Sequence, residues 1–213
     1  MMMSKSLFRL SVATTIGVAM AGIACTGVAQ TQAPASPQSR EAGGKQKRSY
    51  YPLAVGNWWS YKVKDPRKKT TTVKWQVVRK EKEADYGPEA YQLTATPVQS
   101  DEPTILASRE NGIVEPDTGN VLLKNPLQTG DRWSDRSSFS PNTYEVISAG
   151  KPCAAGGRRF RDCAIVRERD EKAALVTLKT YARGVGPVSF VYYKGLDEKK
   201  VDSTVTIESW GVK

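Results

Sequence analysis

The chain has 213 residues, of which 39% are apolar and 25% charged, and it carries 32 lysines and arginines against 22 aspartates and glutamates. This length supports one domain of ordinary size or two small ones, and the composition excludes a membrane helix bundle and a fully disordered chain. The chain has no histidine, which excludes Ser-His-Asp and Cys-His catalysis, imidazole metal sites and histidine-based pH switching.

The N-terminal sequence predicts export. Lys5 and Arg9 precede an uncharged apolar run over residues 10–24, and small residues follow it at positions that suit a signal peptidase. This pattern predicts a signal peptide over residues 1–29. An uncleaved membrane anchor is the weaker alternative, because the run is short and is diluted by glycine and threonine.

A second interpretation of the same segment concerns Cys25. The sequence Gly-Ile-Ala-Cys over residues 22–25 resembles a bacterial lipobox, in which the cysteine is lipidated and the signal ends at residue 24. Residues 30–49 are rich in Gln, Ala, Pro, Ser and Lys and predict a disordered linker. Both interpretations predict a periplasmic or secreted protein, tethered to the membrane through Cys25 in the lipoprotein case.

From residue 50 to residue 213 the sequence predicts a single all-β domain. Apolar and polar residues alternate in short runs rich in β-branched and aromatic side chains, which is typical of antiparallel strands with one buried face. The predicted core-facing residues are Trp59, Tyr61 and Val63; Val73, Trp75 and Val77; Tyr91, Leu93 and Ala95; and Val201, Val205 and Ile207. Turn residues such as Asn111-Gly112 separate about ten strands, which predicts a curved antiparallel sheet or incomplete barrel.

A nine-residue pattern occurs twice. Residues 52–60 and residues 126–134 share Pro-Leu-x-x-Gly-[Asn/Asp]-x-Trp-Ser at an offset of 74 residues. The pattern suits a tight turn that leads into a strand, because glycine adopts positive φ and tryptophan supplies a large apolar surface. The repeat predicts two pseudo-symmetric halves near residues 50–124 and 125–213.

Two cysteines, Cys153 and Cys163, flank the turn sequence Ala-Ala-Gly-Gly at residues 154–157. An oxidising compartment and this hairpin-like separation favour a structural disulfide. Free thiols are the alternative, while a redox role would call for Cys-x-x-Cys spacing, which the pair lacks.

The two proline-leucine motifs, at residues 51–59 and 126–133, and the segment Tyr-Ala-Arg-Gly-Val-Gly-Pro-Val at residues 181–188 resemble a widespread set of uncharacterised bacterial exported proteins and lipoproteins. The resemblance covers most of residues 50–193. Pro187 departs mildly from the usual aliphatic pair, and Cys153 is an addition to the usual single late cysteine. The resemblance implies a curved sheet or incomplete barrel similar to envelope lipoprotein carriers, and it implies no catalytic residues.

The formal net charge is +10, and without Lys5 and Arg9 the mature chain keeps 30 basic and 22 acidic residues, a net charge of +8. An exported cationic domain is attracted to anionic lipid or cell-wall polymer, although a simply solvated surface is the alternative. Basic clusters at residues 67–69 and 158–161 fit either interpretation. Nucleic acid is not an expected partner, because the chain has no recognition motif.

Two functional classes remain. In the first, Trp59, Trp75, Tyr91 and Trp133 line a concave face that binds an apolar or amphipathic ligand or an envelope protein segment, without catalysis. In the second, the chain is a structural or accessory envelope protein with a filled core and a cationic surface. An enzyme ranks third, because the carboxylate pairs lie beside turn signals and no cofactor or metal motif is present.

Overall fold

The computed structural model describes residues 49–67, 69–97, 103–135 and 141–213, which all belong to one compact unit spanning residues 41–213. The predicted signal peptide, Cys25 and residues 30–48 of the predicted linker lie outside the described residues. No helix among the described residues is long and apolar enough to cross a membrane.

The described residues form twelve β-strands and one four-residue helix. The strands are β1 (Trp58–Lys64), β2 (Thr70–Lys80), β3 (Ala90–Thr96), β4 (Thr104–Arg109), β5 (Gly112–Glu115), β6 (Asn120–Lys124), β7 (Arg132–Ser134), β8 (Thr143–Ala155), β9 (Arg158–Asp170), β10 (Leu175–Ala182), β11 (Gly186–Lys194) and β12 (Lys200–Gly211), and the helix is α2 (Glu83–Tyr86). The all-β prediction is therefore confirmed.

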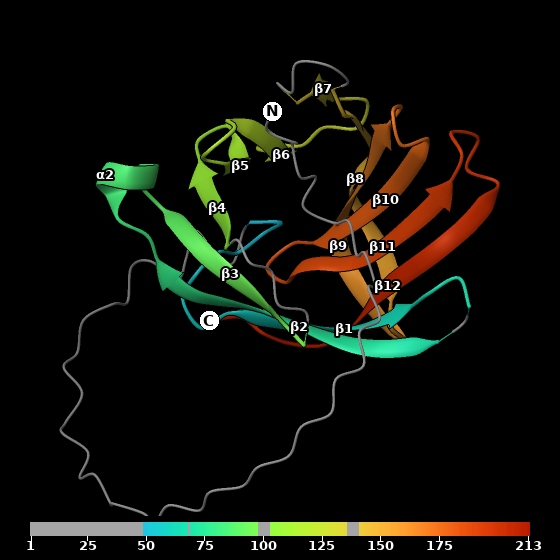
Figure 1. Ribbon diagram of the computed structural model, residues 1–213, viewed down its shortest axis with the longest axis horizontal. Coiled ribbons are helices and arrows are strands. Elements are labelled where there is room, and N and C mark those ends of the chain that lie inside the picture. The colour runs from blue at the N-terminus through green and yellow to red at the C-terminus, as the bar shows by residue number, and fades with distance from the viewer. Residues whose placement is uncertain (1–48, 68, 98–102, 136–140) are drawn as a thin grey trace, which may run out of the picture. The chain divides into compact units, whose positions relative to one another are not determined.

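All twelve strands belong to one antiparallel sheet in the order β6-β5-β4-β3-β2-β1-β12-β11-β10-β9-β8-β7. Each strand pairs with its neighbours in sequence except at β6 and β7, which do not pair with each other. The first strand also pairs with the last, so that β6 and β7 become the two edges. Figure 1 shows the sheet curling until these edges approach each other at the top of the view, opposite β1 and β2. The result is a nearly closed barrel.

Two predictions about the strands are wrong. The sheet has twelve strands instead of about ten, because β5, β6 and β7 have only four, five and three residues and are too short to show alternation. Val201 was predicted to face the core with Val205 and Ile207, but half of its surface is exposed (50%). A register shift between Tyr192 and Tyr193 of β11, opposite the start of β12, accounts for this difference.

The two copies of the repeated motif make the same backbone turn. In each copy the glycine amide donates a hydrogen bond to the carbonyl of a valine on a later strand. The amide of the same valine donates to the carbonyl of the residue that follows the glycine. The pairs are Gly56 and Asn57 with Val77, and Gly130 and Asp131 with Val146, at 2.8–2.9 Å. Both glycines have φ near +90°, as the turn requires. The two copies of the motif are thus structurally equivalent at the turn. A duplication of the whole halves stays a prediction.

The hairpin of β8 and β9 projects beyond β10 and reaches β12. A Cβ placed on Gly156, at the hairpin tip, would meet the Ile207 carbonyl oxygen at 2.0 Å, so only glycine fits there. Next to the tip, the Arg158 guanidinium lies 4.9 Å from the centre of the Trp210 ring, and Phe160 packs on the same ring. The tip therefore packs against the C-terminal half of β12.

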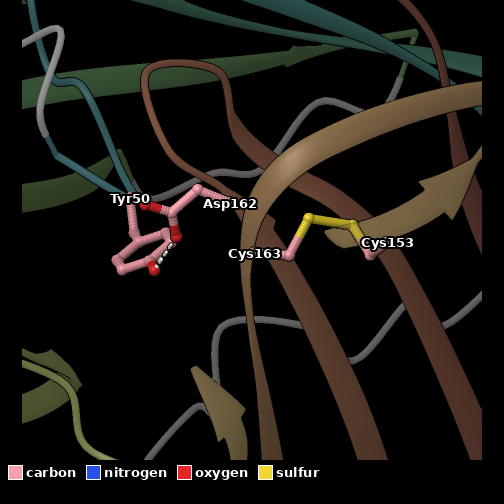
Figure 2. Close-up of a disulfide and its surroundings, with 4 residues drawn as sticks. All are labelled: Tyr50, Cys153, Asp162 and Cys163. Carbon is pink, nitrogen blue, oxygen red and sulfur yellow. Dashed lines mark hydrogen bonds between the residues drawn. A yellow bond between two sulfur atoms is a disulfide. The ribbon is translucent and has the colours of Figure 1, made fainter. Parts of the chain in front are cut away.

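The predicted disulfide is present and joins the two strands of this hairpin. Cys153 of β8 and Cys163 of β9 are bonded, with their Cα atoms 6.0 Å apart (Figure 2). Cys163 is buried and lies opposite Ala182, at the end of β10. The disulfide therefore lies at the point where the β8–β9 hairpin extends beyond the end of β10.

Removing this disulfide is expected to destabilise the protein. For a closed loop of ten residues, the chain-entropy model gives a loss of about 2.5 to 3 kcal/mol in the free energy of unfolding. Urea denaturation of the Cys153→Ser/Cys163→Ser double variant measures it, with the reduced wild-type protein as a matched control. An unchanged free energy of unfolding in both would contradict a stabilising role.

Candidate functional site

The structure places three of the four predicted aromatic site residues on neighbouring strands. Trp59 of β1 lies directly opposite Trp75 of β2 and, on its other side, Trp210 of β12. Directly opposed residues of antiparallel strands share a face. The side chains of Trp75, Trp59 and Trp210 therefore form a row on the face that carries the core. Tyr91 lies on β3, the next strand, whereas Trp133 lies on β7, at one edge of the sheet.

Two of the four aromatic residues are part of the packed core. Trp59 has no exposed surface (0%), and its indole Nε1 donates to the Val185 carbonyl at 2.5 Å. Tyr91 is also buried; its hydroxyl donates to the Glu89 carboxylate, and burial, followed by this hydrogen bond, raises the pKa of the tyrosine. Trp75 and Trp133 are half-buried and retain surface that a ligand could contact.

The edges of the sheet meet at a seam, which we define as β6, β7 and the loop at residues 125–131 between them. Side chains bridge the seam: the Trp133 indole donates to the Val121 carbonyl at 2.7 Å, and the Lys124 ammonium donates to the Arg132 carbonyl at 3.4 Å. The Trp133 ring stacks on Tyr144 at 5.1 Å between centroids. Among the described residues, neither β6 nor β7 has a second backbone partner.

A pocket of about 400 Å³ lies at this seam. Its lining combines two apolar residues with amides and one charge of each sign: Val121, Pro126, Asn111, Asn125, Gln128, Lys124 and Asp131. The volume lies near the lower end of the range of small-molecule sites, and the pocket is more open to solvent than enclosed. None of the four predicted aromatic residues lines the pocket, although Val121 accepts the hydrogen bond from Trp133.

A charged group lies in the core close to Trp133 and was not predicted. Lys179 of β10 forms a 2.6 Å ion pair with Glu168 of β9, and their side chains are only 7% and 12% exposed. Tyr144 and Asn142 both donate to Glu168, each at 3.2 Å. Burial, and then the charge of Glu168, raise the pKa of Tyr144, so this hydroxyl stays protonated.

A further carboxylate from the other side of the barrel lies near this ion pair. Burial raises the pKa of Glu115 at the end of β5, while hydrogen bonds from Thr118 and Asn120, and then the positive charge of Lys179, oppose the shift. Glu115 of β5 therefore lies within electrostatic range of Lys179 of β10. Among the described residues, no group of acidic or cysteine side chains could hold a metal ion.

The described residues of the predicted basic clusters lie at the surface. Arg67 and Lys69 are exposed in the turn between β1 and β2, and Arg158 packs on Trp210. Asp162, beside the disulfide, accepts a hydrogen bond from Tyr50 (Figure 2). It accepts a second one from Arg183. Burial alone would raise the pKa of Asp162, but these hydrogen bonds bring it below its ordinary value. Through these hydrogen bonds, Asp162 of β9 holds both the segment before β1, which contains Tyr50, and the turn after β10, which contains Arg183.

Comparisons with known proteins identify solved structures that the chain resembles, of which two are described. One is a candidate exported protein with a YmcC-like fold from Bacteroides fragilis, 11% identical, with a TM-score of 0.42, covering 76% of this chain and 98% of its own. The other is a candidate lipoprotein from Parabacteroides distasonis, 14% identical, with a TM-score of 0.41 and the same coverage. No family model and no curated protein matches the chain.

Proposed function

We propose that the chain is an exported, non-catalytic envelope protein that binds an apolar or amphipathic ligand inside the barrel, and that the seam is where the ligand enters. The signal-peptide pattern supports export, and so does the disulfide, because structural disulfides persist in oxidising compartments. Lipidation at Cys25, and an origin of the two halves by duplication, belong to the same proposal.

The observation that carries the proposal is the seam. Elsewhere in the sheet each strand is held by backbone hydrogen bonds on both sides, but β6 and β7 face each other through side chains alone. Side-chain contacts can open without breaking a strand ladder. The seam pocket, with Lys124 and Asp131 in its lining, suits the polar end of an amphipathic molecule.

The size of the barrel supports an interior site. Barrel diameter grows with strand number, and eight strands already leave an interior that side chains or one small ligand fill. A sheet of twelve strands can enclose more space than one of eight. Buried residues such as Tyr50 and Leu53, in the segment before β1, belong to the core and reduce what is left for a ligand. Of the four predicted aromatic residues, Trp75 and Trp133 are the two that are only half-buried, so their rings can contact a ligand.

Binding is expected to change the fluorescence of Trp133. Titration with dodecanoate should give a saturable change in tryptophan emission, and Trp133→Phe should lose most of that change. Trp58→Phe is the matched control, because Trp58 belongs to the opposite face of β1 and should leave the titration unaltered.

The absence of any response in the wild-type protein would contradict a ligand site inside the barrel. That result would favour the second candidate, a structural or accessory envelope protein. The complete enclosure of Trp59 and the burial of Tyr91 are the observations that support this alternative.

A further inference from the structure

The positive charge of the chain is concentrated in one hairpin. Residues 58–80, which form β1, β2 and their turn, contain eight lysines and arginines and a single acidic residue, Asp65. The hairpin therefore has a net charge of +7, compared with +10 for the whole chain. Asp65 itself holds the turn, because its carboxylate accepts a hydrogen bond from the Lys69 amide at 2.8 Å.

The strand register places three of these lysines on the outer face of the sheet. Lys62 lies between Thr72 of β2 and Thr206 of β12, directly opposite both. Lys64 and Trp58 alternate with buried residues of β1 and so share the face of Lys62. Lys74 lies opposite Ser60, which is on the same face. We call this surface the lysine face: Trp58, Lys62, Lys64, Thr72, Lys74 and Thr206.

The charges of the lysine face are available to a partner. The side chain of Lys62 is 61% exposed, and Lys64 and Lys74 are exposed as well. Lys62 pairs with Glu208 at 3.0 Å, but an ion pair this exposed contributes little and is readily exchanged. Successive lysines on β1 are about 7 Å apart and the neighbouring strand is about 5 Å away, so a linear polyanion can contact several at once.

Trp58 gives the lysine face a second kind of contact. Its ring is half-buried, with the Lys74 ammonium 4.9 Å from the ring centre. An indole face presents an apolar surface to the C–H groups of a sugar ring, while the threonine hydroxyls donate to and accept from sugar hydroxyls. The combination of lysines, hydroxyls and one aromatic ring matches an acidic polysaccharide.

A membrane surface fits this face less well. Peripheral membrane binding combines positive charge with apolar side chains that enter the lipid. Among the described residues, the exposed large aliphatic side chains are Val55, Val78, Ile147 and Val201, and none of them belongs to the lysine face. The half-buried Trp58 is the one large apolar side chain that this face offers to a lipid.

We infer that the lysine face binds an acidic polysaccharide of the cell envelope, with the lysines contacting its carboxylates and Trp58 stacking on a sugar ring. This surface lies on the opposite side of the sheet from the proposed ligand site, and the inference does not depend on that site. Because the attraction is electrostatic, binding weakens steeply as the salt concentration rises.

Affinity electrophoresis of the full processed protein in gels containing polygalacturonate tests the inference, with neutral dextran as the uncharged probe. Lys62→Gln/Lys64→Gln/Lys74→Gln should weaken binding by about tenfold or more. Lys172→Gln/Lys194→Gln/Lys200→Gln removes the same charge from exposed positions elsewhere and should change binding by less than about twofold. All six lysines are exposed, so both variants are expected to fold.

Trp58→Ala separates a sugar polymer from a general anionic surface. It should weaken binding to polygalacturonate several-fold and leave any binding to vesicles of phosphatidylglycerol and phosphatidylcholine unchanged. Equal effects of the two lysine variants would overturn the inference. Vesicle binding as tight as polygalacturonate binding, with Trp58→Ala neutral in both, would also overturn it and would assign the face to a membrane.

Discussion

Replacing Trp59 with alanine is expected to lower the free energy of unfolding by about 3 to 5 kcal/mol. The side chain has no exposed surface, packs against Tyr51 at 5.7 Å between ring centres, and donates a hydrogen bond to the Val185 carbonyl. The substitution thus creates a cavity and leaves a partly buried carbonyl without its donor. It also removes a contact that holds the turn between β10 and β11 to β1.

Trp58→Ala is the matched control, because it removes the same side chain from the adjacent position on the other face of β1. Trp58 is half-buried, so the expected loss is below about 2 kcal/mol. Urea denaturation followed by circular dichroism measures both variants. Equal losses would contradict the assignment of Trp59 to the packed core and Trp58 to the outer face.

Replacing Lys179 with methionine is expected to cost about 3 to 5 kcal/mol, because it leaves the carboxylate of Glu168 buried without its counter-charge. Both side chains are almost fully enclosed, at 7% and 12% exposure, and their charged atoms are 2.6 Å apart. Tyr144 and Asn142 would still donate to Glu168, but neither supplies a positive charge.

The double variant Lys179→Met/Glu168→Gln should recover at least half of that loss, since a neutral amide can keep the hydrogen bonds of the carboxylate. The measurement is again the free energy of unfolding in urea at neutral pH. A double variant less stable than Lys179→Met alone would show that the ion pair does not account for the cost.

Much of the fold could be predicted from local sequence patterns. Alternation placed Trp59, Tyr61 and Val63 on the buried face of β1, as the structure shows. The turn residues around Gly156 and the spacing of the cysteines predicted both the β8–β9 hairpin and its disulfide. These features depend on interactions between residues close in the chain, which a single sequence records directly.

The closure of the sheet could not be predicted in the same way. Pairing of β1 with β12 joins residues about 150 positions apart, and nothing local distinguishes this pairing from an open sheet. The strands at the seam are too short to show a period, so the seam and its pocket were missed.

The buried ion pair of Lys179 and Glu168 was missed for a different reason. Charged residues in an alternating strand ordinarily mark the solvated face, and here they mark the interior. Lys179 shares its face with Tyr181, which is buried, and this alternation is the sequence signal that could have located it. The carboxylate partner belongs to the neighbouring strand and becomes identifiable only when the β9–β10 register is known.

The seam is tested most directly by backbone hydrogen exchange, with and without dodecanoate. Amides of β6 that point away from β5, and amides of β7 that point away from β8, should exchange at least about tenfold faster than the amides of β1, which has a partner strand on each side. They should become slower when dodecanoate is added. Protection in β6 and β7 equal to that in β1, unchanged by dodecanoate, would show a barrel closed by backbone pairing and would contradict ligand access at the seam.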